Sequence, residues 1–277
     1  MKKACLILVL AAAAACTEKE ELSRIPEEII LRTGEACAFE TKAMSEVKSL
    51  SSFNLLTTDA SNGTVTSNRS VSVSSGLVNT GCYWPASGSM CFFGVYPAAS
   101  LANSSGTISF QVGSSSSKLN GTEDYVFARS RGVANGTRPV QMTFSHILSN
   151  ITAFSFSTPN GVGYSISSIS ISIPRYGRYV SSTASDSWDS LGSRESVSLS
   201  QSPDYSVIPG TYTVTVSYSV TSGGVSQSWT KSGTVTLPAG KRCTISSSLT
   251  NTRAPLTLSV AVSDWTTGST WTENFSR

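Results

Sequence analysis

The sequence predicts an all-β fold with two antiparallel β-sandwich domains in tandem. Serine and threonine dominate the chain, with 55 and 30 copies among 277 residues. Serine is a weak helix former, whereas threonine suits a half-buried pleated sheet. Short segments alternate between apolar and polar residues, and no segment shows a sustained 3.6-residue apolar stripe. Short strands separated by turns rich in Gly, Pro, Asn and Ser are typical of antiparallel sandwiches.

The pattern of the amino terminus is typical of an export signal. A short cationic start is followed by an apolar run over residues 4–15, which is too short to span a bilayer. Small residues lead directly to Cys16, an arrangement that resembles the lipobox of bacterial lipoproteins. We therefore expect residues 1–15 to be a lipoprotein signal peptide and Cys16 to carry acyl chains, with an ordinary secretory signal as the alternative.

The segment 16–32 is predicted to be a flexible tether followed by a first strand. An acidic cluster follows the cysteine, as in a solvated and flexible segment. Residues 27–32 form a short apolar strand that ends at a basic residue, directly before a turn signal. We expect this strand to complete the first sandwich with Ile29 and Leu31, or Ile30, in its core.

The first half of the chain contains four further strand patterns. They lie at residues 71–73, 90–96, 108–112 and 125–128. The second of them is almost continuously apolar, which predicts a strand buried on both faces. The loop at 131–139 is rich in turn residues and has no apolar period. We therefore expect one sandwich over residues 33–136 and a second over residues 137–277.

The second half shows the clearest alternation. Apolar residues over 212–220 alternate with Thr or Ser at every position, which predicts one buried and one solvated face. A Gly-rich turn follows, and the chain returns through residues 225–237. Residues 169–173 and 256–262 alternate in the same way, and Pro174 ends the former.

The composition excludes several classes of function. His146 is the single histidine of the chain, which removes most Ser/His/Asp, Cys/His and multi-His metal schemes. A lone histidine between apolar residues is more often a hydrogen-bonded strand residue than a ligand. The net charge is only +3, and the mature chain has no basic run longer than two residues. We expect no enzymatic activity, no metal, no cofactor and no nucleic acid as a partner.

Two groups of residues that could form a functional site, an Asp/Trp segment and the cysteines, are better explained by a structural role. Residues 186–189 place two aspartates beside a tryptophan, which could suggest a sugar or metal site, but their Ser- and Gly-rich surroundings favour a solvated loop. The mature cysteines apart from Cys16 fit no zinc or redox spacing, and these are Cys37, Cys82, Cys91 and Cys243. Buried free thiols are favoured, and a bridge between Cys82 and Cys91 stays open.

Taken in order, several segments resemble the fimbrillin family of the Bacteroidetes, the lipoprotein pilins of type V fimbriae. Besides the lipobox and its acidic cluster, the matching segments are residues 39–43, 83–85, 92–97, 124–128, 140–151, 208–212, 237–241 and 260–265. Each segment is short, and the ordered set covers most of the chain.

The resemblance implies two transthyretin-like sandwiches and a surface fimbria built from lipidated precursors. In the family, a trypsin-like protease removes an N-terminal strand after an arginine, and the groove accepts a strand of another subunit by β-strand addition. This implies cleavage at Arg32, with Arg24 as the runner-up, and other fimbrial subunits as partners. It also implies an outer-membrane anchor through Cys16 and adhesion to a host or bacterial surface ligand. The subunit could form the stalk, the anchor or the tip of the fimbria. Residues 27–32 could also be a first strand that is never removed.

Two further hypotheses accompany this interpretation. The alternative function is a surface glycan-binding lipoprotein of carbohydrate uptake. In addition, Asp189–Leu191 resembles the short O-glycosylation signal of exported Bacteroides proteins, which makes Ser190 a weakly indicated modification site.

Overall fold

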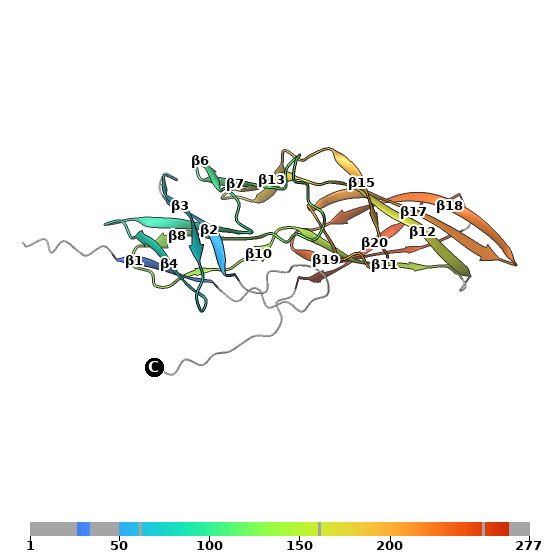
Figure 1. Ribbon diagram of the computed structural model, residues 1–277, viewed down its shortest axis with the longest axis horizontal. Helices are drawn as coiled ribbons and strands as arrows, with labels where there is room; N and C mark the ends of the chain where they lie inside the picture. Colours follow the sequence, from blue (N-terminus) through green and yellow to red (C-terminus); the bar gives the residue numbers. More distant parts are fainter. Residues whose placement is uncertain (1–26, 34–49, 61–62, 160–161, 251–252, 266–277) are drawn as a thin grey trace, which may run out of the picture.

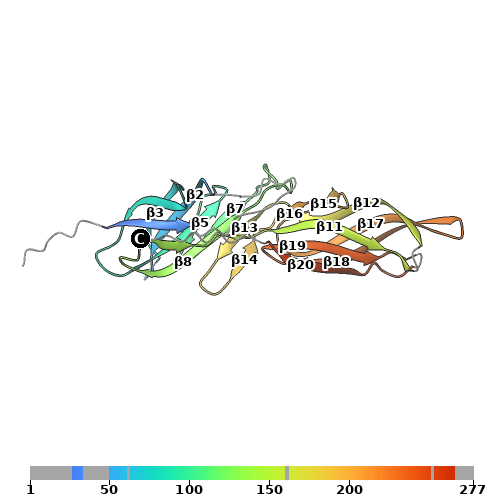
Figure 2. The ribbon, with the colours of Figure 1, turned by 90° about the horizontal axis from the view of Figure 1, so that it is seen from below.

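The computed structural model describes residues 27–33, 50–60, 63–159, 162–250 and 253–265. These residues form an elongated all-β molecule without an α-helix, as predicted (Figures 1 and 2). The N-terminal strand lies near one end of the long axis, and the hairpin around residue 223 forms the other end. No helix that could cross a membrane occurs in the described part of the chain.

Twenty strands form five sheets in these residues, and each sheet is named after one of its strands. The β1 sheet consists of β4 (Leu77–Tyr83), β1 (Glu28–Thr33) and β9 (Val140–Met142). The β5 sheet consists of β10 (Ser145–His146), β8 (Val126–Ala134), β5 (Ser89–Tyr96), β2 (Ser52–Asp59) and β3 (Val65–Ser72). The β13 sheet consists of β14 (Asp186–Asp189), β13 (Gly177–Ser181), β7 (Thr107–Val112) and β6 (Ala102–Ser104).

The remaining two sheets lie in the C-terminal half. The β11 sheet consists of β16 (Tyr205–Val207), β11 (Ser149–Ser157), β19 (Lys241–Ser248) and β20 (Leu258–Asp264). The β17 sheet consists of β15 (Arg194–Leu199), β12 (Gly163–Pro174), β17 (Gly210–Ser222) and β18 (Val225–Leu237).

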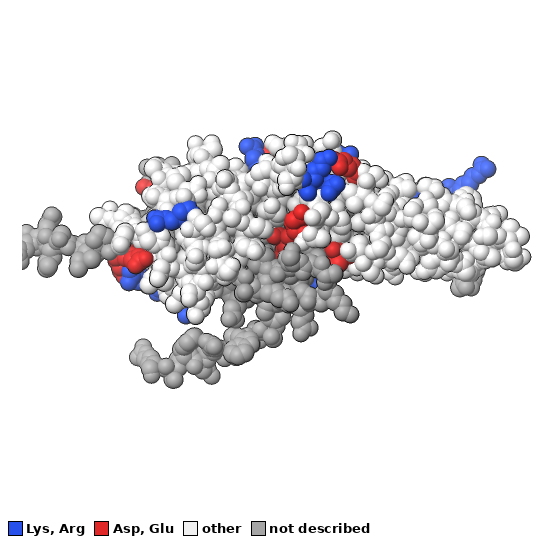
Figure 3. Space-filling model, in the orientation of Figure 1, with Lys and Arg blue, Asp and Glu red and all other residues white. Residues whose placement is uncertain are grey.

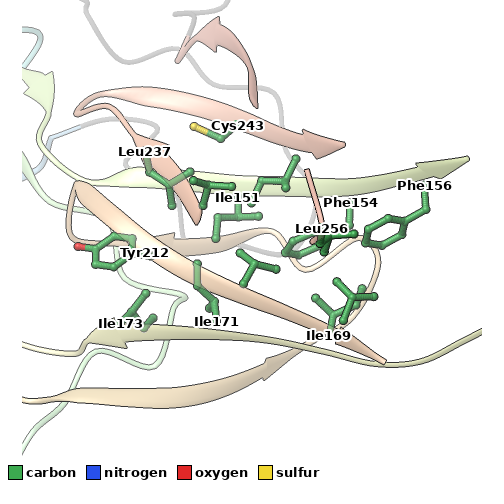
Figure 4. Packing of buried hydrophobic residues seen from close by; sticks show 14 of the residues in the cluster. Ile151, Phe154, Phe156, Ile169, Ile171, Ile173, Tyr212, Leu237, Cys243 and Leu256 are labelled. Atoms are coloured by element: carbon green, nitrogen blue, oxygen red, sulfur yellow. The ribbon is translucent and has the colours of Figure 1, made fainter. Parts of the chain in front are cut away.

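The β11 and β17 sheets enclose one apolar core (Figure 4). Buried and half-buried residues alternate along β17, because successive side chains of a strand point to opposite faces. The outward face carries hydroxyl side chains that bond across the strands, such as Thr215 to Ser232 at 2.8 Å. The alternation predicted for residues 212–220 is therefore confirmed. The face seen in Figure 3 is almost free of charged residues toward this end of the molecule.

The turn and the strand ends in this half lie at or near the predicted positions. β17 and β18 are joined by a two-residue turn in which Gly223 and Gly224 have φ values of 58° and 78°, a conformation that favours glycine. β12 ends at Pro174 as predicted. β20, an edge strand of its sheet, begins two residues later than predicted, and its Val262 is 55% exposed.

The N-terminal half contains a strand buried on both faces. β5 is buried at every position except its two ends, which confirms the prediction for residues 90–96. A Cβ atom at Gly94 would lie 2.8 Å from the ring of Phe144, so the close packing of that ring requires glycine. Phe144 in turn makes an edge contact with Phe53, with ring centroids 5.0 Å apart.

Strands from the two halves of the chain meet in the β13 sheet. β13 pairs with β7, and the rings of Phe110, Phe127 and Tyr179 pack together. β8 continues to Ala134, so the predicted loop at 131–139 begins only after that residue. The domain boundary between residues 136 and 137, and the transthyretin-like arrangement of the two sandwiches, stay predictions.

Candidate functional site

β1 lies in the middle of its sheet. It runs antiparallel to β4 and parallel to β9, and Leu31 lies opposite Val78 on one side and Val140 on the other. The side chains of Ile29 and Leu31 have no exposed surface, which confirms the predicted burial of this pair. Both belong to an apolar cluster that also includes Phe53, Leu55, Phe92, Met142 and Phe144. β1 therefore fills an apolar groove between two strands.

Polar contacts also hold β1 in this groove. The Thr80 hydroxyl donates to the carbonyl of Ile29 at 2.8 Å, and the amide of Trp84 donates to the carbonyl of Glu27 at 3.0 Å. The guanidinium of Arg138 lies 2.9 Å from the Glu27 carboxylate and donates to the carbonyl of Glu28. The strand is thus bound along its length by backbone, hydroxyl and charged groups.

Arg32 lies near the C-terminal end of β1. Its side chain is exposed, while its backbone lies opposite Leu77 on β4 and Gln141 on β9. The amide of Thr33 donates to the carbonyl of Gly76 at 2.9 Å. The peptide bond after Arg32 therefore lies within the paired sheet, and a protease could reach it only after this end of β1 separates from its neighbours. Cys16 and Arg24 lie outside the described residues.

Ser190 occupies the turn that follows β14. It is exposed and has a φ of 48°. The preceding Asp189 accepts two hydrogen bonds from Arg178, each 2.7 Å long, and these bonds lower the pKa of its carboxyl group. Residues 186–189 form a strand, so their interpretation as a solvated loop is wrong. β14 pairs with β13 through its backbone, and an edge strand needs no apolar alternation to do so.

Of the four cysteines that follow Cys16 in the sequence, three are free and buried, namely Cys82, Cys91 and Cys243. This confirms the preference for buried thiols over a bridge between Cys82 and Cys91. Burial raises the pKa of Cys243 to about 11, so its thiol stays protonated and unreactive at neutral pH. Cys37 lies outside the described residues.

His146 closes a small buried cluster at the end of β10. Its Nδ1 atom lies 2.8 Å from a carboxylate oxygen of Asp124, and its ring stacks on Trp265 with centroids 4.1 Å apart. The expectation of a hydrogen-bonded strand residue is therefore confirmed. Asp124 and Trp265 were not predictable as its neighbours, since neither lies near it in the sequence. Within the described ranges, no group of three or more His, Cys, Asp or Glu could hold a metal ion.

Comparison with family models identifies one family for this chain. A family model described as fimbrillin-like matches residues 37–265. Among solved structures, a fimbrial protein from Bacteroides vulgatus ATCC 8482 is similar, with a TM-score of 0.52 and 13% identity over 77% of this chain and 93% of that chain. A protein from Bacteroides uniformis ATCC 8492 whose proposed role is cell adhesion has a TM-score of 0.50 and 14% identity, over 86% and 99% of the two chains. At this identity the likeness shows a shared fold. Among curated proteins, none matches this chain.

Proposed function

The chain belongs to the fimbrillin-like family, and we propose that it is a subunit of a surface fimbrium that assembles by β-strand addition and mediates adhesion. Family membership supports a fimbrial role. The fold shared with a fimbrial protein and with a protein proposed to act in cell adhesion adds to this support. The position of β1 is the observation that carries the proposed assembly.

Among the described strands, β1 is the one strand that pairs with β4 or β9 in a sheet. Loss of β1 would leave both strands with an unpaired edge, and such edges readily accept another strand. The groove between them would also expose the apolar cluster that now covers Ile29 and Leu31. Burial of a large aliphatic side chain stabilises by roughly 1.5–3 kcal/mol, so refilling these two positions gives a strong driving force for strand uptake.

Cleavage after Arg32 would release β1. Cleavage after Arg24, the runner-up, would leave β1 attached and open no groove. A permanent β1 is the alternative, and it would suit an anchor subunit. The proposed processing depends on opening of the end of β1, because Thr33 is paired in the sheet.

The donated strand would come from the C-terminal segment of another subunit. The sequence offers residues 256–262 and 270–275 for this role. Residues 258–264 already pair with β19, so their donation would disrupt the β11 sheet. We therefore favour residues 270–275, in which Trp271 and Phe275 could supply apolar side chains.

Export and anchoring complete the proposal. Residues 1–15 would direct export, and acylation of Cys16 would hold the precursor on the outer membrane with its sandwiches outside the cell. Ser190 is exposed in a turn, as an O-glycosylation acceptor needs to be. An added hexose mass at Ser190 in protein from the native host would support that modification, and an unmodified intact mass would remove it.

Limited proteolysis of the purified precursor tests the assembly. We expect trypsin at limiting concentration to cut after Arg32 and to produce oligomer ladders that resist SDS without strong heating. Arg32→Ala is the matched control, because it keeps an exposed position on β1 and removes the cleavage site. A chain that stays monomeric after complete cleavage at Arg32 would contradict assembly by strand addition.

A further inference from the structure

A cavity of about 380 Å³ opens between the edges of two sheets. On one side lies β10, the last strand of the β5 sheet, and on the other lies β14, the last strand of the β13 sheet. β14 lies near the middle of the long axis, where the two halves of the chain meet (Figure 2). The volume falls within the range of roughly 300–1,000 Å³ that is typical of small-molecule sites.

Aromatic rings form the apolar part of the cavity wall. Trp188 and Tyr179 pack edge to face with centroids 5.3 Å apart, and Phe127 lies behind Tyr179 at a further 5.3 Å. Trp188 is half-buried, so its ring is partly open to the cavity, whereas Tyr179 is almost fully buried. A half-buried ring backed by others offers a firm apolar platform for a flat ligand.

Paired charges and hydroxyl groups form the polar part. Arg129 and Asp186 form an ion pair across the cavity wall, and Arg129 also donates to the Ser181 hydroxyl at 3.0 Å. Their side chains keep 40% and 35% of their surface exposed. A guanidinium has five N–H donors and a carboxylate accepts several bonds, so the pair can bond a ligand while its charges cancel. The exposed side chains of Ser145 and Ser187 add hydroxyl groups.

The base of the cavity is rigid. His146 lines it with a side chain that is 5% exposed. Asp124, whose side chain is completely buried, bonds to the His146 ring, and Trp265 stacks on it. Because these contacts fix the ring, a ligand would lose little free energy in ordering this part of the wall.

We propose that this cavity binds a neutral saccharide unit and is the ligand site of the adhesive role. A sugar ring combines apolar C–H faces, which suit Trp188, with hydroxyl groups that both donate and accept, which suit Arg129 and Asp186. A strongly anionic ligand is disfavoured because Asp186 neutralises Arg129. This inference rests on the proposed adhesive function, but it does not depend on removal of β1, since no residue of β1 lines the cavity.

Binding by the uncleaved, monomeric chain tests the proposal, so a failure to polymerise and a failure to bind give separate results. Saturation-transfer NMR would be recorded with the methyl glycosides of glucose, galactose, mannose, fucose and N-acetylglucosamine, and with methyl glucuronide as an anionic probe. We expect at least one neutral glycoside to bind and methyl glucuronide not to. Binding of the glucuronide alone, or of no probe, would overturn the proposal.

Matched variants assign the binding to this cavity. Asp186→Asn and Trp188→Ala should each weaken binding by about tenfold, as expected for loss of a charged hydrogen bond or of the aromatic platform. Asp189→Asn is the control, because Asp189 lies on the same strand and pairs with Arg178 but does not line the cavity. Equal affinities for Asp186→Asn, Trp188→Ala and the wild type would place the binding elsewhere and overturn the proposal.

Discussion

Leu31 and Arg32 are neighbours on β1, yet substitutions at these two positions should affect stability differently. Leu31 has no exposed surface, whereas Arg32 is exposed. We predict that Leu31→Ala lowers the free energy of unfolding by about 2–5 kcal/mol, since it leaves a cavity in the apolar cluster. Arg32→Ala should change it by less than about 0.5 kcal/mol. Urea denaturation of the uncleaved precursor measures both, and equal effects would contradict the role of β1 as a core strand.

A second pair of residues tests the packing of the N-terminal half. Gly94→Ala would place a Cβ atom 2.8 Å from the Phe144 ring and 3.1 Å from the Phe53 ring, so we predict a loss of about 1–3 kcal/mol. Gly163 is the matched control, because it also lies in a strand and a Cβ atom there meets no atom within 4 Å. Gly163→Ala should be neutral or slightly stabilising in the same denaturation assay. A Gly94→Ala protein as stable as the wild type would show that Phe144 can move.

At the scale of elements, the pairing of β7 with β13 links the two halves. A fragment of residues 27–136 lacks β13 and β14, and it also lacks β9, one of the two neighbours of β1. Phe110 would lose its contact with Tyr179 in this fragment. We predict that the fragment unfolds without a cooperative transition and binds a dye specific for exposed apolar surface, whereas the full chain unfolds cooperatively. Cooperative unfolding of the fragment would instead support an independent domain ending at residue 136.

The elements also show what the sequence could and could not predict. β17 was predictable because one of its faces is buried and the other carries hydroxyls, which leaves a strict alternation. β14 was missed because an edge strand is held by backbone bonds and ion pairs, which leave no periodic pattern. β1 was expected as a strand with Ile29 and Leu31, or Ile30, inside, and the structure buries Ile29 and Leu31. Its parallel pairing with β9 depends on contacts far apart in the sequence, and no local pattern encodes them.

The cavity between β10 and β14 could not be predicted for the same reason. Arg129 comes from β8, His146 from β10, Tyr179 from β13 and Trp188 from β14. The sequence places Asp186 two residues before Trp188, but it could not indicate that Arg129 pairs with Asp186. These side chains line one cavity only because the edges of the β5 and β13 sheets lie next to each other.

For the whole molecule, the proposed lipid anchor at Cys16 would decide where the protein is found. We predict that Cys16→Ser releases the protein into the soluble fraction or leaves it unprocessed, because acyl chains on Cys16 would supply the membrane affinity. Fractionation of cells followed by mass measurement checks this. A variant that stays bound to the membrane at the normal mature mass would contradict lipidation at Cys16.

We propose that removal of β1 converts a monomeric precursor into a polymerising subunit. The most direct measurement is the N-terminal sequence of this chain recovered from assembled fimbriae of its native host. We predict a chain that begins at Thr33 and lacks residues 27–32, as expected if a strand of another subunit fills the groove between β4 and β9. A chain that retains residues 27–32 within the body of the fimbria would show that β1 is a permanent strand and would rule out this mode of assembly.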